Sequence, residues 1–193
     1  MSRKGKVLMV LALAFAIAGL GQVASAAWIH AKAWLAQELI AQAWAASRDS
    51  ASAPRPWPGA DLRPVARLAI PARGVELYVL DNPSPNALSF GPAWVAGTAA
   101  PGSAGNAVIV AHRDTHFAFL QRLQADDVIE VEGLRGVHAR YRVREATVVE
   151  KSETRVLDSA DSAQLTLITC YPFDAVRPGT PWRFVVVADR TET

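Results

Sequence analysis

The sequence predicts an all-β domain, either a barrel or a sandwich, that follows a helical N-terminal segment. Three features of the 193 residues support this prediction. From Val65 onward, short runs rich in β-branched residues alternate with turn sequences. Before them lie an uncharged apolar run, residues 7–29, and a segment dense in Ser and Pro, residues 47–64. Short strands at close spacing, separated by Gly- and Pro-containing turns, are typical of barrels and sandwiches.

The N-terminal segment has the composition of a membrane span. Residues 7–29 carry no charge and follow Arg3, Lys4 and Lys6. A run of this length is sufficient for a helix to cross a bilayer core of about 30 Å. Basic residues before such a span keep the N-terminus in the cytoplasm and send the rest of the chain across the membrane. We therefore expect a transmembrane signal anchor within residues 1–29.

A cleaved secretory signal peptide is the alternative, because Ala24-Ser25-Ala26 fits a cleavage site for small residues. The apolar run is longer than the usual h-region of about 7–15 residues. It also ends beside Trp28, and tryptophan is typical of membrane interfaces. These two features favour a retained anchor.

The residues after the apolar run predict a helix and then a linker. Residues 28–46 are rich in Ala and contain no Gly or Pro, which favours a helix. This helix is either a stalk near the membrane or a first helix packed on the domain. Residues 47–64 have the composition of a linker. The expected organisation is an anchor over 1–29, a stalk and linker over 30–64, and the folded domain over 65–193.

The domain itself is expected to contain seven strands and one short helix, at Phe117 to Leu123. The predicted strands are VARLAI (65–70), VELYVL (75–80), NAVIVAH (106–112), DVIEVEG (127–133), VHARYRVREATVV (137–149), QLTLIT (164–169) and WRFVVVA (182–188).

Charge and cysteine content exclude two further features. The formal net charge of the chain is +2. Residues 1–47 hold four of the basic residues and one acidic residue, +3 in all, so residues 48–193 hold −1. The domain thus has no basic excess that would indicate a nucleic-acid partner. With one cysteine, Cys170, the chain cannot form an internal disulfide.

Two residues with reactive side chains stand at the ends of predicted strands. Cys170 follows the apolar run LTLIT and precedes the long loop YPFDAVRPGTP, and His112 ends the apolar run NAVIVA. A free cysteine is often an inert core residue, and a histidine at a strand end is often structural. Beside a loop, however, both side chains can face a substrate cleft while the strand holds the backbone rigidly.

Arg183 is the third candidate, because it is the one charged residue of an otherwise apolar strand, residues 182–188. A guanidinium there must be paired or face a cleft. If this strand pairs antiparallel with the strand that ends at Cys170, Arg183 lies beside the thiol. Arginine can favour a thiolate or stabilise an oxyanion. Arg177, in the connecting loop, is a rival whose position favours a solvated role.

The other ionisable residues are weaker candidates. His112 and His116 are four residues apart, but the first lies on a strand, Arg113 stands where the helical zinc motif has Glu, and no third ligand is recognisable. His138 alternates with arginines on the polar face of its strand, and His30 lies in the stalk. The acidic residues that allow either a calcium site or a solvated turn and strand face are Asp126, Asp127, Glu130 and Glu132.

Three sequence motifs together carry a resemblance to a known family. They are TLITC ending at Cys170, AHRDTHF containing His112, and PWRFVV containing Arg183. Over roughly residues 60–190 the sequence resembles the sortases, which are membrane-anchored cysteine transpeptidases. The extended forms HRDTHF and TLITCYPF, with WVAGTAAPGSAGN before them, are most similar to the sortases of Gram-negative bacteria, which are related to class D. Ala111 is a departure, since many sortases have Gly before the histidine.

The resemblance implies a fold and a reaction. The fold is a closed eight-stranded β-barrel with short helices, and its eighth strand is expected within residues 86–97. Cys170 would attack the Thr–Gly carbonyl of an LPXTG-like C-terminal sorting signal and form a thioacyl enzyme, which an amine then resolves. His112 would exchange the protons, and Arg183 would hold the substrate or its oxyanion. No cofactor or metal is implied, while a calcium requirement stays open. The domain would stand on the periplasmic side of the inner membrane.

Three alternatives remain beside the transpeptidase. A membrane-anchored cysteine hydrolase would use water as the acceptor and share the thioacyl step. An L,D-transpeptidase usually carries Ser-His-Gly-Cys, whereas Ile168 and Thr169 precede the cysteine here. The last alternative is a non-catalytic exported β-barrel that binds a partner and keeps Cys170 in its core.

Overall fold

The computed structural model describes residues 3–47 and 50–191 and divides the chain into two compact units, Met1–Glu38 and Leu39–Thr193. One helix, α1 (Arg3–Ala45), contains all the described residues of the first unit and begins the second. The two helical segments expected over 7–29 and 28–46 therefore form one continuous helix. No proline interrupts this stretch, and its many Ala and Leu residues are strong helix formers.

Among the described residues, no helix is both long enough and apolar enough to cross a membrane. The transmembrane anchor expected within residues 1–29 is therefore not supported by the structure. Residues 1–2 lie outside the described residues, as do the side chains of several members of the apolar run, 7–12 among them.

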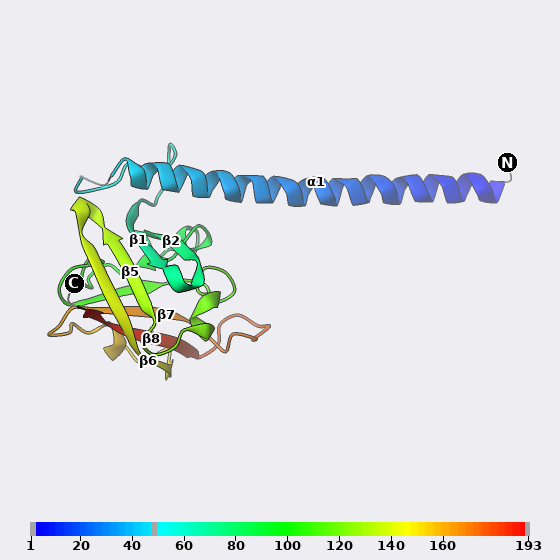
Figure 1. Cartoon of the computed structure of the whole chain (residues 1–193). Helices are drawn as coiled ribbons and strands as arrows, with labels where there is room; N and C mark the ends of the chain where they lie inside the picture. The colour runs from blue at the N-terminus through cyan, green and yellow to red at the C-terminus, as the bar shows by residue number, and fades with distance from the viewer. Residues whose placement is uncertain (1–2, 48–49, 192–193) are drawn as a thin grey trace. The chain divides into compact units, whose positions relative to one another are not determined.

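The described part of the second unit contains eight strands that form a closed barrel, in the order β1-β2-β3-β4-β7-β8-β6-β5 (Figure 1). This confirms the barrel and excludes the sandwich. The strands are β1 (Pro64–Ile70), β2 (Val75–Leu80), β3 (Ala93–Trp94), β4 (Asn106–Val110), β5 (Val128–Gly133), β6 (His138–Glu150), β7 (Gln164–Tyr171) and β8 (Trp182–Thr191).

All seven strands predicted from the sequence are present, and the eighth, β3, lies within residues 86–97 as expected. Most neighbouring strands pair antiparallel, but β2 pairs parallel with β3, and β4 pairs parallel with β7. β7 and β8 lie side by side, in orange and red in Figure 1. The wall β4–β7–β8 therefore joins three of the motifs found in the sequence.

The interior of the barrel is filled by the side chains that alternate inward along each strand. In β1 every second residue is buried. The core of the barrel includes Leu68, Ile109, Leu167 and Val186. The expected helix near residues 117–123 is a 3-10 helix, Ala118–Arg122, whose Phe119 and Leu120 are buried in the same core. Burial of these side chains fixes the segment that leaves β4.

The segment predicted as a linker is buried at several points along its length. Ala53, Ala60 and Leu62 are buried. Leu62 belongs to an apolar cluster with Ile40, at the end of α1, and with Leu80 of β2. Residues 39–63 thus contribute to the folded unit, which agrees with the alternative that the end of the helix is packed on the domain.

Candidate active site

Cys170 and Arg183 face each other across two neighbouring strands. β7 and β8 pair antiparallel, and in their register Cys170 lies opposite Arg183. Side chains directly opposite in such a pair lie on the same face, with Cβ atoms about 4.5–5.5 Å apart. The neighbourhood predicted from the sequence for these two residues is therefore present.

His112 is brought to the same end of the wall by β4. In the parallel register of β4 and β7, Val110 lies opposite Ile168. Beyond the strand, the Ala111 N–H donates to the carbonyl of Ile168 at 3.3 Å, and the Thr169 hydroxyl donates to the carbonyl of Ala111 at 2.7 Å. Extended by two residues, this register puts His112 level with Cys170. His112 is exposed and Cys170 is partly exposed.

The three residues stand at the end of an apolar cluster on the outer side of the barrel wall. Along β7 and β8, Leu167 and Val186 point into the barrel core, whereas Ile168 and Val185 belong to a separate cluster with Val108. By alternation, Cys170 and Arg183 continue the face of this second cluster. The outer apolar cluster consists of Val108, Ile168, Val185 and Val187, with Val95, Val110, Val149 and Val156 packed against it.

A buried asparagine fixes the chain segment that borders this cluster. The Asn106 amide donates to the carbonyls of Val156 at 3.1 Å and Asp158 at 3.0 Å, and its oxygen accepts from the Thr166 hydroxyl at 2.7 Å. Val156 and Asp158 lie in the connection between β6 and β7, residues 151–163. Asn106, which is 3% exposed, therefore ties this connection to the barrel wall.

The Arg183 guanidinium is held by backbone carbonyls. Its Nη1 donates to the carbonyls of Thr180 at 2.9 Å and Trp182 at 2.8 Å. The residue is partly exposed, so the charge is both paired and in contact with solvent, as expected from the sequence. A guanidinium carries five N–H donors, and these two bonds use only one of its nitrogens. The rival Arg177 lies exposed in the β7–β8 connection.

Three aromatic rings pack together where the β7–β8 connection leaves and rejoins the sheet. The rings of Tyr171 and Phe184 stack with centroids 6.1 Å apart, and Phe173 meets Phe184 edge-on at 5.2 Å. Such pairs stabilise by about 0.5–1.5 kcal/mol beyond the area they bury. They hold the backbone on both sides of the Cys170–Arg183 pair.

Arg113, directly after His112, is a buried charge that the sequence reasoning missed. Its side chain is 6% exposed, and its guanidinium donates to the carbonyl of Ala175 in the β7–β8 connection. The only signal in the sequence was its place in the motif HRDTHF. An arginine after an apolar strand ordinarily lies where the chain leaves the core, so its burial was not expected. A cavity of about 550 Å³ lies beside it, lined by Arg113, Asp114, Ala118, Gln121, Tyr171, Pro172, Phe173 and Asp174.

His116 is partly buried and lies near His112. Burial lowers the pKa of His116 below its ordinary value of 6.5, a hydrogen bond to the Ser89 backbone opposes this shift, and the charge of His112 adds to it. Within the part of the chain that the structure describes, no group of three or more His, Cys, Asp or Glu side chains is placed to hold a metal ion.

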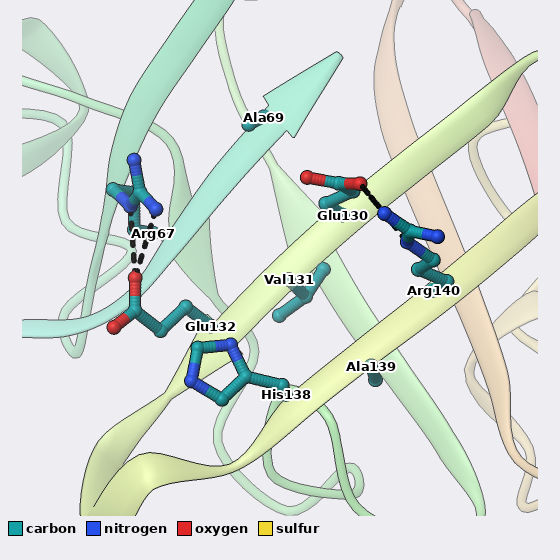
Figure 2. A pocket seen from close by; sticks show the side chains of 8 residues that line it. All are labelled: Arg67, Ala69, Glu130, Val131, Glu132, His138, Ala139 and Arg140. Atoms are coloured by element: carbon teal, nitrogen blue, oxygen red, sulfur yellow. Dashed lines mark hydrogen bonds and ion pairs between the residues drawn. The ribbon is translucent and has the colours of Figure 1, made fainter. Parts of the chain in front are cut away.

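The acidic residues considered as calcium ligands are paired with arginines. Two of the pairs line a shallow pocket of about 350 Å³ on the outer face of β1, β5 and β6, where His138 lies beside Glu132 (Figure 2). This is the solvated polar face predicted for His138. The pairs are Arg67–Glu132 at 3.0 Å, Arg140–Glu130 at 2.9 Å, Arg73–Asp127 at 2.6 Å and Arg142–Asp126 at 3.6 Å.

Comparison with known proteins identifies the domain that carries this geometry. The model of the sortase domain matches residues 68–191. Sortase D of Bacillus subtilis (strain 168) is 27% identical over 124 residues, which cover 64% of this chain and 62% of that protein. The match therefore spans less than two thirds of the relative's length.

Solved structures show the same fold. Sortase A from Corynebacterium diphtheriae has a TM-score of 0.62 and 27% identity, over 70% of this chain and 64% of its own. Clostridium perfringens sortase C, solved with the C-terminal cell wall sorting motif, has a TM-score of 0.57 and 26% identity, over 66% of this chain and 70% of its own.

Proposed function

The chain belongs to the sortase family, and on this premise we propose that it is a cysteine transpeptidase with Cys170 as its nucleophile. One observation carries the proposal: the β7–β8 register sets Cys170 opposite Arg183. The parallel register of β4 and β7 adds His112 at the same level. The similarity to a sortase D is consistent with a class-D-like member of the family.

In the first half-reaction the Cys170 thiol passes its proton to His112, and the sulfur attacks the carbonyl carbon between Thr and Gly of an LPXTG-like sorting signal. A C–S bond forms, and the carbonyl oxygen becomes an oxyanion that the free N–H groups of Arg183 stabilise. His112 then gives a proton to the leaving amine as the C–N bond breaks. The product is a thioacyl enzyme, and the peptide that begins with Gly departs.

The second half-reaction transfers the acyl group to an amine acceptor. His112 takes a proton from the incoming amine, a new C–N bond forms, and the C–S bond breaks. The electron pair of that bond returns to sulfur, which takes back the proton from His112, so the enzyme is regenerated. Two acyl transfers of moderate barrier replace one direct exchange between amides.

The outer apolar cluster supports a substrate of this kind. It lies on the same face as Cys170 and Arg183, and its partly exposed members, such as Val110 and Val149, are available to the apolar residues of a sorting signal. The related Clostridium perfringens sortase C was solved with a C-terminal cell wall sorting motif. We therefore propose a protein partner that carries such a signal near its C-terminus.

Two alternatives are less well supported. A non-catalytic binding barrel would bury its cysteine, but Cys170 is partly exposed at the end of β7. A cysteine hydrolase would use the same three residues, with water as acceptor. Family membership favours the transfer to an amine.

The location of the enzyme is a proposal from the sequence. The basic residues Arg3, Lys4 and Lys6 before the uncharged run, residues 7–29, favour export of the barrel to the periplasmic side of the inner membrane. A reporter enzyme active only outside the cytoplasm, fused after residue 193, would be active in this case. Activity only of a cytoplasmic reporter at the same position would contradict the proposal.

The function is tested with peptides that contain LPXTG-type sequences and a panel of amines. Wild-type enzyme should cleave the peptide after Thr and join the N-terminal fragment to an amine. The Cys170→Ala variant should do neither, and cleavage or transfer by that variant would contradict the proposed role. Hydrolysis alone, with every amine tested, would favour the cysteine hydrolase.

A further inference from the structure

Arg113 is the most deeply buried ionisable side chain near the proposed catalytic residues. Its side chain is 6% exposed, and it follows His112 directly in the chain. A guanidinium keeps its charge at all physiological pH values, and burying a charge is costly unless it is paired and hydrogen-bonded. Because burying this charge is unfavourable, its contacts indicate a specific role for Arg113.

Those contacts join two segments that are far apart in the sequence. Nη2 of Arg113 donates to the carbonyl of Ala175 at 2.5 Å, and Nε donates to Oδ1 of Asp114 at 3.1 Å. Ala175 belongs to the connection after Cys170, whereas Arg113 and Asp114 belong to the segment after His112. Within the described residues Nη1 of Arg113 has no hydrogen-bond partner. The hydrogen bond to Ala175 is therefore one of the few contacts that offset the unfavourable free energy of burying the guanidinium.

The same two segments form walls of a cavity beside Arg113. Arg113 and Asp114 contribute one wall, and Tyr171, Pro172 and Phe173 contribute another, in a cavity of about 550 Å³. Tyr171 is adjacent to Cys170 in the chain. The connection that Arg113 holds begins two residues after Cys170 and ends two residues before Arg183, so its position affects how a second molecule approaches the sulfur.

We propose that Arg113 is a positioning residue that holds the β7–β8 connection against the His112 segment and so favours the acceptor amine over water at the thioacyl carbon. This inference rests on the proposed transpeptidase function. Water is small and abundant, so a loosely held wall admits it readily. An amine needs a defined approach, and misplacement of an acceptor by about 1 Å can cost about 10²-fold in rate.

A merely structural role for Arg113 would lower the amount of active enzyme without changing how each thioacyl enzyme is resolved. The decisive quantity is therefore the ratio of hydrolysis product to transfer product at fixed amine concentration. This ratio does not depend on how much of the enzyme is active, because both products come from the same intermediate.

The experiment compares full-length wild type with Arg113→Met, Arg113→Lys and the control Arg122→Met. Arg122 is an exposed arginine on the neighbouring 3-10 helix. We expect the ratio to rise about tenfold in Arg113→Met, since lost orientation penalises the amine more than water. It should rise less in Arg113→Lys, which keeps the charge but lacks the forked donor. It should stay at the wild-type value in Arg122→Met.

A wild-type ratio in both Arg113 variants would overturn the proposal. If Arg113→Met does not fold, Arg113→Lys decides by the same criterion. Hydrogen exchange provides a readout that needs no activity: residues 172–181 should exchange faster in the Arg113 variants than in wild type or Arg122→Met. Unchanged exchange there would also overturn the proposal. A wild type that forms no thioacyl enzyme would contradict the proposed function, and hydrogen exchange would still show whether Arg113 holds the connection.

Discussion

Cys170 stands directly opposite Arg183 in the antiparallel pair of β7 and β8, and the Arg183 guanidinium is tied to the carbonyls of Thr180 and Trp182. The backbone register sets the two residues opposite each other, while Thr180 in the loop between the strands helps to hold the guanidinium. Groups carried by strands are held more accurately than groups carried by loops. A nucleophile and an oxyanion donor require this accuracy.

The first prediction concerns the fork of donors on Arg183. Arg183→Lys keeps a positive charge but replaces a planar guanidinium with a single ammonium. We expect peptide cleavage to slow by about 10²-fold or more, as when one oxyanion donor is removed. The melting temperature should stay close to that of the wild type. Near-normal cleavage, together with a large loss in Arg177→Lys, would move the role to Arg177.

The second prediction concerns proton transfer by His112. His112→Gln should reduce both cleavage and transfer by about 10²- to 10⁴-fold, the usual contribution of a general acid–base group. Rates are measured with the peptide and amine in excess. His138→Gln serves as the matched control, because His138 lies on the polar face of β5 and β6 (Figure 2). Equal rates in the two variants would contradict the assignment.

The third prediction concerns the tether at Asn106. Asn106→Ala removes two hydrogen bonds to the β6–β7 connection and leaves the Thr166 hydroxyl without its acceptor. We expect a loss of about 1–3 kcal/mol in the free energy of unfolding. The KM for the sorting peptide should rise more than kcat falls, since the connection borders the outer apolar cluster.

Ser152→Ala is the control for Asn106→Ala, because Ser152 is exposed in the same connection. It should change neither stability nor KM. A fall in kcat at unchanged KM in Asn106→Ala would show that the tether serves the reacting groups instead of the substrate surface.

The fourth prediction concerns the pH dependence of stability. Burial lowers the pKa of His116 below 6.5, so the unfolded chain binds a proton at this site more readily than the folded protein. Stability from His116 is thus fully present above about pH 6.5 and is lost as the pH falls through its folded pKa. The free energy of unfolding, measured in urea from about pH 7 to about pH 5, should fall less steeply in His116→Gln than in wild type.

His138→Gln, a substitution on the polar face of β5 and β6, provides the comparison for the pH series. Equal slopes in wild type and His116→Gln would mean that His116 does not titrate differently in the folded and unfolded states.

The long strands and the Cys170–Arg183 pair could be predicted from the sequence because they follow simple periodicities. Alternation of apolar and polar residues marks β6, and an apolar run ended by a loop marks β7. Once the two strands that flank residues 172–181 are taken as neighbours, an antiparallel register aligns residue 170 with residue 183. The two-residue strand Ala93–Trp94 is too short to have a periodicity, and only the resemblance to the family indicated where it lies.

Other features depend on contacts that no local pattern reports. Arg113 is buried because Ala175, 62 positions later in the chain, supplies a carbonyl to it. Ala53 and Leu62 pack on the barrel although their segment has the composition of a linker. The acidic residues near β5 resemble possible metal ligands in the sequence, but partners such as Arg67 and Arg73 come from distant strands and turns.

The most direct test of the central claim is the intact mass of the full-length enzyme after brief mixing with an LPXTG-type peptide in the absence of amine. The account predicts a mass increase equal to the acyl fragment that ends in Thr, located on Cys170 by peptide mapping. The adduct should be absent in Cys170→Ala and should disappear when an amine is added. An adduct on another residue, or cleavage of the peptide by Cys170→Ala, would contradict it.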